Sequence, residues 1–336
     1  MSKDQPNQNL YRSFFWPVIL LGAGVIWLLS NLEVIPTESL WILFQLWPVL
    51  IIMAGLDVLF ARRLPLLGAL LGLLVIAAVI YVLLNGAALG LEGQPEPRFE
   101  SFTVEVGDTV SVDFDLELSI QEATVSVLTD SDNLLEADIG HVGEIEFTVV
   151  GTEEKFIDLL QRGIESWFPW VLLTEEDDEL LWDIRLSPDV PFDLKVAAST
   201  GRAELDMTGL QLERFRFDGS TGSSTIILPA SEEGYDTHID GSTGIIEIVF
   251  PLESNLTVRL DCGTGSVLLD IPEEAAVKLQ VLDGGTGKLQ LPDRLSKVSG
   301  RMGQDEGVYK TADYETAAFQ LVIIIEDMGT GNIIAQ

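Results

Sequence analysis

A Thr-Gly pair recurs at nearly constant spacing through the second half of the chain, and this repeat limits the fold more than any other feature. Five pairs stand at Thr200-Gly201, Thr221-Gly222, Thr243-Gly244, Thr264-Gly265 and Thr286-Gly287. Successive pairs are 21 or 22 residues apart, and a further pair, Thr330-Gly331, follows two periods later. A fixed period of this length is typical of a β-solenoid in which each repeat forms one rung of a stack.

Apolar and polar residues alternate after each glycine, which predicts a strand with one buried face. The predicted inward positions are Ala203, Leu205, Met207, Ser224, Ile226, Leu228, Ile246, Ile248, Phe250, Val267, Leu269 and Ile271. Proline cannot donate to a ladder and therefore ends the strand at Pro229, Pro251 and Pro272. On the polar side, Ile227, Val249 and Leu268 interrupt the pattern and indicate a contact surface.

A second short strand precedes each turn, so each predicted rung has two strands and two corners. These strands end at Phe217, Ile239, Leu260 and Leu282. The glycines are predicted to serve the turn, where a Cβ would obstruct the backbone. The structural turn glycines are Gly201, Gly222, Gly244, Gly265, Gly287 and Gly331.

An aspartate stands three residues before most of these threonines. The aspartates are Asp218, Asp240, Asp261, Asp283 and Asp327. Stacked at a strand spacing of ~4.8 Å, their carboxylates either form a cation-binding ladder or each cap their own turn. We favour capping, because calcium repeats need more oxygen ligands per rung than this motif offers.

The other residue types that often bind metals or cofactors are scarce. The chain has one cysteine, Cys262, at a position where sister repeats carry glycine, and two distant histidines, His141 and His238. No disulfide can form within the chain, and no zinc-type ligand spacing is present. We therefore expect no metal site and no cofactor.

The segment before the repeats is less regular. Within residues 99–196, several short runs alternate as strands do, and residues 153–173 begin with a pattern that favours an amphipathic helix through Phe156, Leu159, Leu160 and Ile164. Trp167, Phe168 and Trp170 follow, and we expect them to pack over the end of the solenoid. Residues 293–318 interrupt the repeat and are expected to form a loop or an atypical rung.

Three apolar runs lie near the N-terminus, at residues 14–32, 40–60 and 64–84, and each is about long enough to cross a bilayer. Lys3 and Arg12 precede the first run, and Arg62 and Arg63 separate the second from the third. The positive-inside rule then places the N-terminus in the cytoplasm and the chain beyond the third run outside it. A re-entrant third run would reverse the side of the second domain.

These features divide the chain into four parts. We expect a transmembrane region at residues 1–91, a linker at 92–98, an irregular β cap at 99–196 and a regular all-β solenoid at 197–336. The formal net charge is −34, and beyond residue 97 the chain holds 47 acidic residues against 15 lysines and arginines. Such a surface repels phosphate backbones, so nucleic-acid binding is not expected.

Two parts of the chain resemble known families. Trp16-Pro17-Val18 and Trp47-Pro48-Val49, with Ala23-Gly24 and Ala54-Gly55, are similar to the membrane region of LiaI/LiaF-type proteins of bacterial envelope-stress systems. Residues 115–290, with LLEADIG, LLWDIRLSPDVPFDLKV and ASTGRAELDMTGLQLERFRFDGSTG, resemble the toastrack family. The resemblance implies a stacked β-solenoid attached to membrane segments and supplies no catalytic residues.

The sequence favours a non-catalytic scaffold or sensor of the cell envelope that contacts membrane lipid and an envelope protein. The alternative is a surface structural or adhesive protein that self-associates through open solenoid ends, since unpaired strand edges bind one another. A homo-oligomer is compatible with either. An enzyme is not expected, because no nucleophile elbow, phosphate loop or His-Cys or His-Ser arrangement is present.

Overall fold

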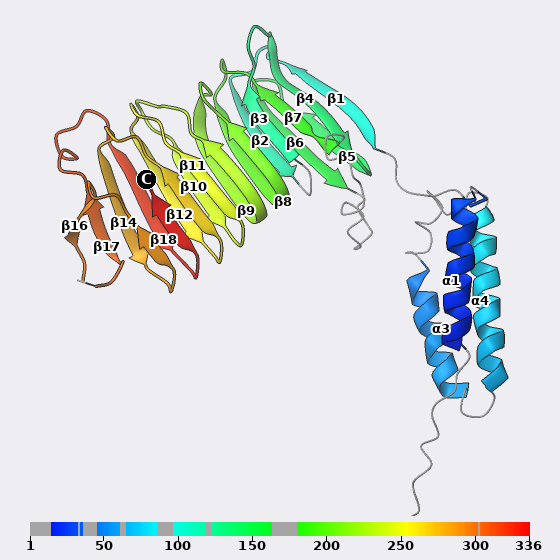
Figure 1. Ribbon diagram of the computed structural model, residues 1–336. Helices are drawn as coiled ribbons and strands as arrows, with labels where there is room; N and C mark the ends of the chain where they lie inside the picture. The colour runs from blue at the N-terminus through cyan, green and yellow to red at the C-terminus, as the bar shows by residue number, and fades with distance from the viewer. Residues whose placement is uncertain are drawn as a thin grey trace, which may run out of the picture. The chain divides into compact units, whose positions relative to one another are not determined.

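The computed structural model describes residues 15–32, 34–35, 46–60, 65–85, 97–118, 122–162, 180–301 and 303–336 (Figure 1). The chain divides into two compact units, with the boundary between Glu96 and Pro97. The predicted aromatic cluster Trp167, Phe168 and Trp170 lies outside the described residues, as does most of the predicted linker.

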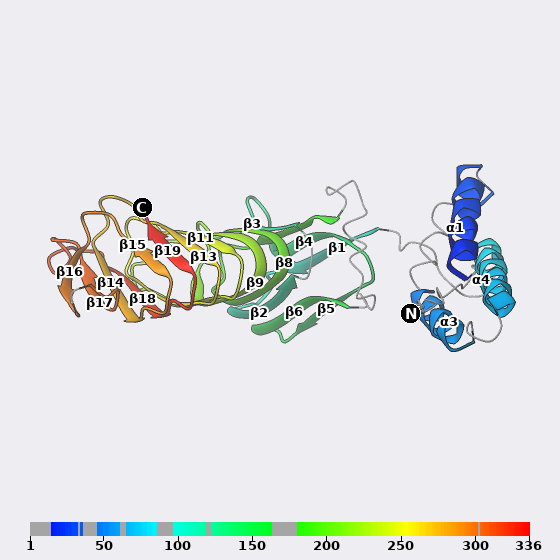
Figure 2. The ribbon, with the colours of Figure 1, turned by 60° about the horizontal axis from the view of Figure 1, so that its bottom comes forward.

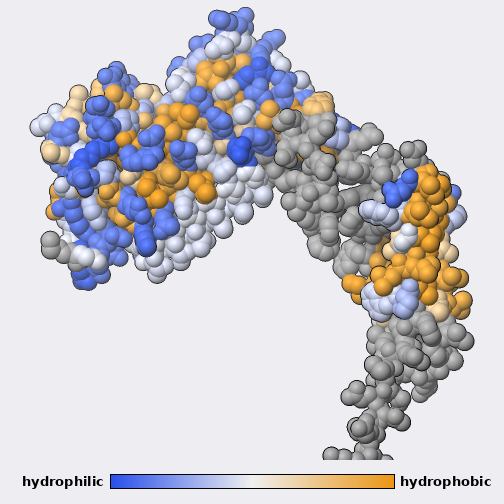
Figure 3. Space-filling view, viewed as in Figure 1, coloured by the Kyte–Doolittle hydropathy of each residue, from blue (hydrophilic) through white to orange (hydrophobic). Residues whose placement is uncertain are grey.

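The described part of the first unit is helical. Its helices are α1 (Phe15–Asn31), α3 (Trp47–Phe60) and α4 (Pro65–Asn85). Glycine permits α1 and α4 to approach closely, since a Cβ on Gly22 would lie 2.3 Å from Cδ1 of Ile76. Leu20, Leu21 and Trp27 are each more than two thirds exposed. Figure 3 shows hydrophobic residues covering much of the visible surface of the helices.

The helices coincide with the three apolar runs predicted as spans. Among the described residues, however, no helix has both the length and the apolar character that crossing a membrane requires. The three-span topology therefore stays a prediction.

The second unit is built from strands in its described part. The strands before the repeats are β1 (Arg98–Glu105), β2 (Ser111–Leu118), β3 (Glu122–Val127), β4 (Asn133–His141), β5 (Glu144–Val150), β6 (Glu154–Arg162) and β7 (Trp182–Leu186). The remaining strands are β8 (Phe192–Asp206), β9 (Leu212–Ile227), β10 (Asp236–Gly241), β11 (Ile245–Val249), β12 (Leu256–Cys262), β13 (Ser266–Asp270), β14 (Val277–Asp283), β15 (Lys288–Gln290), β16 (Ser296–Ser299), β17 (Gly307–Lys310), β18 (Leu321–Asp327) and β19 (Asn332–Ala335).

The strands form two layers that share one core, and β8 and β9 bend through the corner to belong to both (Figure 2). Layer one runs in space as β5-β6-β2-β8-β9-β10-β12-β18-β14-β17-β16. Layer two runs as β1-β4-β7-β3-β8-β9-β11-β13-β19-β15. We call a layer-one strand and the layer-two strand that follows it a coil.

The alternation predicted from the sequence is confirmed in the core. Each predicted inward position is buried, including Leu205, Ile226, Ile248 and Leu269, which have no exposed surface. Neighbouring coils pair in parallel and in register, so Asp240 lies between Asp218 and Asp261. Equivalent side chains thus form continuous columns along the stack, which is what period-two strands joined at a constant interval produce.

The order of the coils in the stack differs from their order in the chain at both ends. β18 pairs in parallel with both β12 and β14, so the C-terminal coil β18/β19 lies between coils β12/β13 and β14/β15. Likewise β2 pairs in parallel with both β6 and β8, so the later coil β6/β7 lies outside coil β2/β3. The pair Thr330-Gly331 therefore belongs inside the stack, although its place in the sequence suggested a rung beyond a gap.

Two local predictions are wrong. Residues 154–162 form strand β6 instead of a helix, with Ile157 and Leu159 inward and Phe156 outward. Residues 293–318 contain β16 and β17, an antiparallel pair that covers β14. At the end of β14, Val281 is buried and Leu282 is exposed, because β14 and β18 carry one extra residue there relative to β12.

Candidate binding surfaces

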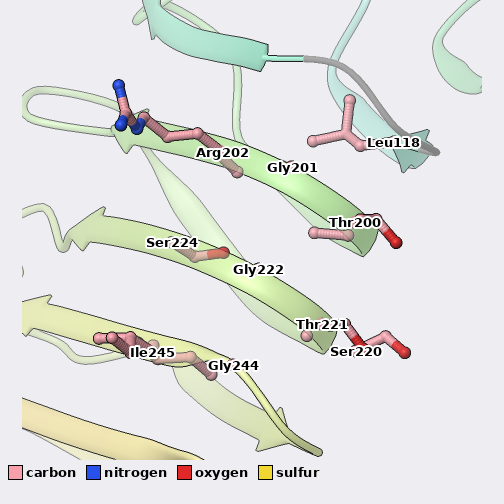
Figure 4. A pocket seen from close by; sticks show the side chains of 14 residues that line it. Leu118, Thr200, Gly201, Arg202, Ser220, Thr221, Gly222, Ser224, Gly244 and Ile245 are labelled. Atoms are coloured by element: carbon pink, nitrogen blue, oxygen red, sulfur yellow. The ribbon is translucent and has the colours of Figure 1, made fainter. Parts of the chain in front are cut away.

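The Thr-Gly corners form a column along one edge of the layers (Figure 4). Their glycines allow backbones to meet: a Cβ on Gly265 would lie 2.0 Å from the carbonyl oxygen of Gly244, and one on Gly331 would lie 2.2 Å from that of Gly265. Gly287 in turn contacts Gly331. The predicted turn glycines thus lie one above the other in the order of the coils.

A shallow groove crosses this corner over β8, β9 and β11. Leu118, Thr200, Ser220, Thr221 and Ile245 contribute to its lining (Figure 4). Of the described residues that line it, only Arg202 is charged, and its Nη1 lies 3.4 Å from Glu122 Oε1. A groove without a titratable group free for proton transfer offers no basis for acid–base chemistry.

The five predicted aspartates form one column on the outward side of layer one. In space their order is Asp218, Asp240, Asp261, Asp327 and Asp283. Two of them cap their turns: Asp283 Oδ1 accepts the Gly285 N–H at 2.9 Å, and Asp327 Oδ1 accepts the Gly329 N–H at 2.7 Å. This is the Asx-turn geometry that the capping interpretation requires.

A basic column runs beside the aspartates, two residues before the aspartate in β9, β10 and β12, and it continues to Lys195 in β8. Lys195, Arg216, His238 and Arg259 lie opposite one another on successive strands. Lys195 Nζ lies 2.8 Å from Asp115, and Arg259 lies 3.5 Å from Glu326. The sequence reasoning missed this column, although its signal was present as a base at the same place in three repeats.

The pKa of Asp240, at the middle of the aspartate column, is affected by burial and by repulsion from the neighbouring aspartates. Burial, followed by the carboxylates of Asp261 and Asp218, raises the pKa of Asp240 above its usual value, and the nearby His238 opposes this rise. Among the described residues, no group of three or more His, Cys, Asp or Glu side chains has the arrangement of a metal site. At Asp283 and Asp327 the geometry thus fits turn capping.

The cysteine and the histidines do not come together. Cys262 is buried at the corner opposite Gly241, and burial, together with nearby aspartates, raises the pKa of its thiol to about 12. His141 is fully buried at the end of β4, with Nε2 3.4 Å from Glu100 Oε1, whereas His238 faces outward on β10. A buried, protonated thiol is a poor nucleophile.

The outward side of layer two is different, because apolar residues gather on it. The predicted contact positions Ile227, Val249 and Leu268 all lie there, since their neighbours along each strand are buried. Ile245 and Ile334 share this side. The sequence reasoning missed these two, although both stand at the outward parity of their strands.

Two family models match the chain. The LiaI-LiaF-like transmembrane region matches residues 14–59, and the N-terminal domain of toast_rack matches residues 96–249. No curated protein matches the chain.

Two solved structures resemble the chain weakly. One, from Clostridium sporogenes, is described as a candidate cell adhesion protein; it has 16% sequence identity and a TM-score of 0.45, and the match covers 71% of this chain and 99% of that one. The other, described as a candidate adhesin, comes from Bacteroides fragilis, with 9% identity, a TM-score of 0.27, and coverage of 72% and 97%. Likenesses of this strength carry no argument about function. Each family model matches part of the chain, so the chain is similar to a LiaI-LiaF-like transmembrane region at residues 14–59 and to the N-terminal domain of toast_rack at residues 96–249.

Proposed function

We propose that this protein is a non-catalytic, membrane-anchored scaffold or sensor of the bacterial cell envelope. Its β unit, a β-solenoid of short two-strand rungs, presents a surface to an envelope protein or another envelope component. The single observation that carries the proposal is the union, in one chain, of a LiaI-LiaF-like transmembrane region with a stacked, acidic β unit of the toast_rack type.

The physical features of the two units support this role. The helices expose large apolar side chains, and lipid is the environment in which such surfaces are stable. The β unit offers long, regular outward faces, as solenoids used for protein binding do. Within its described residues, the groups capable of nucleophilic or acid–base chemistry are dispersed or paired, which supports a binding role over catalysis.

The proposed topology has three spans, a cytoplasmic N-terminus and an extracytoplasmic β unit. It is tested by labelling whole cells with a membrane-impermeant maleimide. Ser299→Cys lies in the β unit and Thr37→Cys between the first two apolar runs, and both are placed in a Cys262→Ser background. The proposal requires both sites to label from outside. Labelling of Ser299→Cys only after the cells are opened would refute the extracytoplasmic placement.

The role itself is tested by deletion under envelope stress. A scaffold or sensor predicts that deletion changes the induction of stress genes and that a full-length copy restores it. A truncated copy that lacks residues 97–336 should fail to restore it, because it lacks the binding unit. Unchanged induction in the deletion strain would refute the role.

A further inference from the structure

The apolar residues on the outward side of layer two form one continuous patch. We define the layer-two patch as Ile227, Ile245, Val249, Leu268 and Ile334. Ile227 lies opposite Val249, and Leu268 lies opposite Ile334, on neighbouring strands. Ile245 is 53% exposed, and the other members are half-buried by their neighbours. The patch therefore spans the four adjacent strands β9, β11, β13 and β19.

A single carboxylate sits at the centre of this patch. Glu247 lies on β11 between Ile245 and Val249, and across the strands it faces Thr225 on one side and Leu268 on the other. In the described part of the chain, no ion pair joins Glu247 to a base. Three of these four neighbours are apolar, and a second acid, Asp270, lies opposite Val249 on β13. A base brought to the patch would therefore be attracted by both carboxylates.

Elsewhere on the same layer, acidic side chains form ion pairs with a base. Near its other end, Arg185 on β7 lies within 3.5 Å of Glu136, Asp138 and Asp183. On layer one, Lys195 and Arg259 neutralise neighbouring acids in a similar way. The layer-two patch thus combines apolar area with an acid that forms no ion pair among the described residues, and a partner that carries a base between apolar side chains would complement both.

The net charge of the chain determines which kind of molecule is expected to bind the layer-two patch. The residues beyond 97 hold 47 acids and 15 lysines and arginines, so a second copy of this unit or an anionic lipid surface would be repelled. A partner that carries a base between apolar side chains would pair with Glu247 and cover the patch at once. Such a partner is also drawn to the acidic unit from a distance, which speeds association.

We propose that the layer-two patch binds a basic amphipathic segment of a partner protein, with Glu247 pairing a lysine or arginine. This inference rests on the proposed scaffold role and names its binding face. The control residue is Glu204, which lies on the same outward side. Thr225 separates Glu204 from Glu247 across the strands, and Glu204 is outside the patch.

The test uses the full-length protein in non-ionic detergent micelles, immobilised, with a short labelled peptide of alternating leucine and lysine as the probe. Peptide bound to micelles cancels in the comparison, because every variant is measured in the same detergent. Glu247→Lys should weaken binding by about 10-fold or more, which corresponds to the loss of one desolvated ion pair. Glu204→Lys makes the same change in net charge and should weaken binding by less than about 3-fold.

Leu268→Ser should also weaken binding by about 10-fold without altering any charge, because apolar contact is lost. Ile245→Ser replaces it if Leu268→Ser fails to fold in a thermal melt. Equal effects of Glu247→Lys and Glu204→Lys would overturn the proposal, since the peptide would then respond only to net charge. Competition of phosphatidylcholine vesicles with the peptide would also overturn the proposal, because it would assign the patch to lipid. Self-association of the protein that disappears in Leu268→Ser would overturn it too, because it would assign the patch to a second copy.

Failure of this inference can be told apart from failure of the proposed function. If Ser299→Cys labels from outside and stress induction depends on residues 97–336, while Glu247→Lys and Glu204→Lys behave alike, only the assignment of the patch is wrong. If the labelling fails, the scaffold role is wrong whatever the peptide does.

Discussion

Replacing Gly265 with alanine tests the close stacking of the coils. The added Cβ would lie 2.0 Å from the carbonyl oxygen of Gly244, whereas ordinary contact begins at 3.4 Å. The two coils would have to separate there by about 1.4 Å. Beside this contact, the Thr264 N–H donates to Ser242 O at 2.6 Å and the Ser266 N–H donates to Gly244 O at 3.0 Å. A separation of that size takes both bonds outside hydrogen-bond distance.

The expected loss can be stated from these contacts. Two backbone hydrogen bonds at about 1 kcal/mol each, with the strain of overpacking, amount to roughly 2–4 kcal/mol. For a unit of this size, 1 kcal/mol shifts the melting temperature by about 2–4 °C, so Gly265→Ala should melt about 5–15 °C lower. The assay follows the β-sheet circular dichroism band of the full-length protein in detergent during heating.

The control is Ser266→Ala, next to Gly265 on the outward side of β13. It keeps the backbone donor and should change the free energy of unfolding by less than about 0.5 kcal/mol. If Gly265→Ala melts within a degree or two of Ser266→Ala, then the coils do not stack as closely as the glycine contacts indicate, and the reasoning is refuted.

Four further predictions follow from buried or charged groups. Cys262 is buried and the pKa of its thiol is raised, so it should resist labelling by a maleimide at about pH 7 in the native protein and should react after denaturation. Fast labelling of the native protein would contradict its place in the core. The pKa of Asp240 is raised in the folded protein, so its charged form opposes folding, and Asp240→Asn should raise the urea midpoint of unfolding at about pH 7. This gain in stability should shrink as the pH falls towards the usual pKa of aspartate. A gain that grows towards acid pH would contradict the prediction. Ile323→Ala, in β18 inside the stack, should lower the free energy of unfolding by about 2–5 kcal/mol. Val298→Ala, exposed on edge strand β16, should lower it by less than about 0.5 kcal/mol. Similar losses in the two variants would argue against an interior β18. The full-length protein should sediment independently of concentration in detergent, and reversible association would favour the adhesive alternative.

The sequence sufficed to predict which side chains of the strands point inward. A side chain's direction in a strand depends only on its parity, so the alternation in residues 203–207 or 267–271 identifies the inward positions without knowledge of any partner strand. Pairs at a constant interval then require neighbouring coils to lie in register. The core and the turn column could be predicted because both depend on local pattern.

The helix predicted from residue 153 onward is wrong, because a short apolar run fits both the helical and the strand period. Phe156, Leu159 and Leu160 follow helical spacing, while Ile157 and Leu159 follow strand spacing. The choice is made by partners far away in the chain: β6 pairs with β2 in parallel and with β5 in antiparallel orientation. Local sequence carries no record of those partners, so periodicity alone could not decide between the two structures.

The order of the coils in the stack differs from their order in the chain, and it too could not be predicted from local sequence. This order also determines which strands lie at the ends of the stack. β12, β14 and β18 carry nearly the same pattern of inward residues, so each fits equally well beside either of the others. What distinguishes coil β14/β15 is that the antiparallel pair β16/β17 follows it directly, with β17 pairing antiparallel to β14. At the other end, β5 directly precedes β6 and pairs antiparallel with it. The outermost coils are thus those that lie next to these antiparallel strands in the chain, and another coil fills the place behind each of them. The stack thereby ends on short or charged edges, such as β16 and the Glu144- and Glu146-bearing β5, and these oppose the end-to-end pairing that an adhesive filament would need.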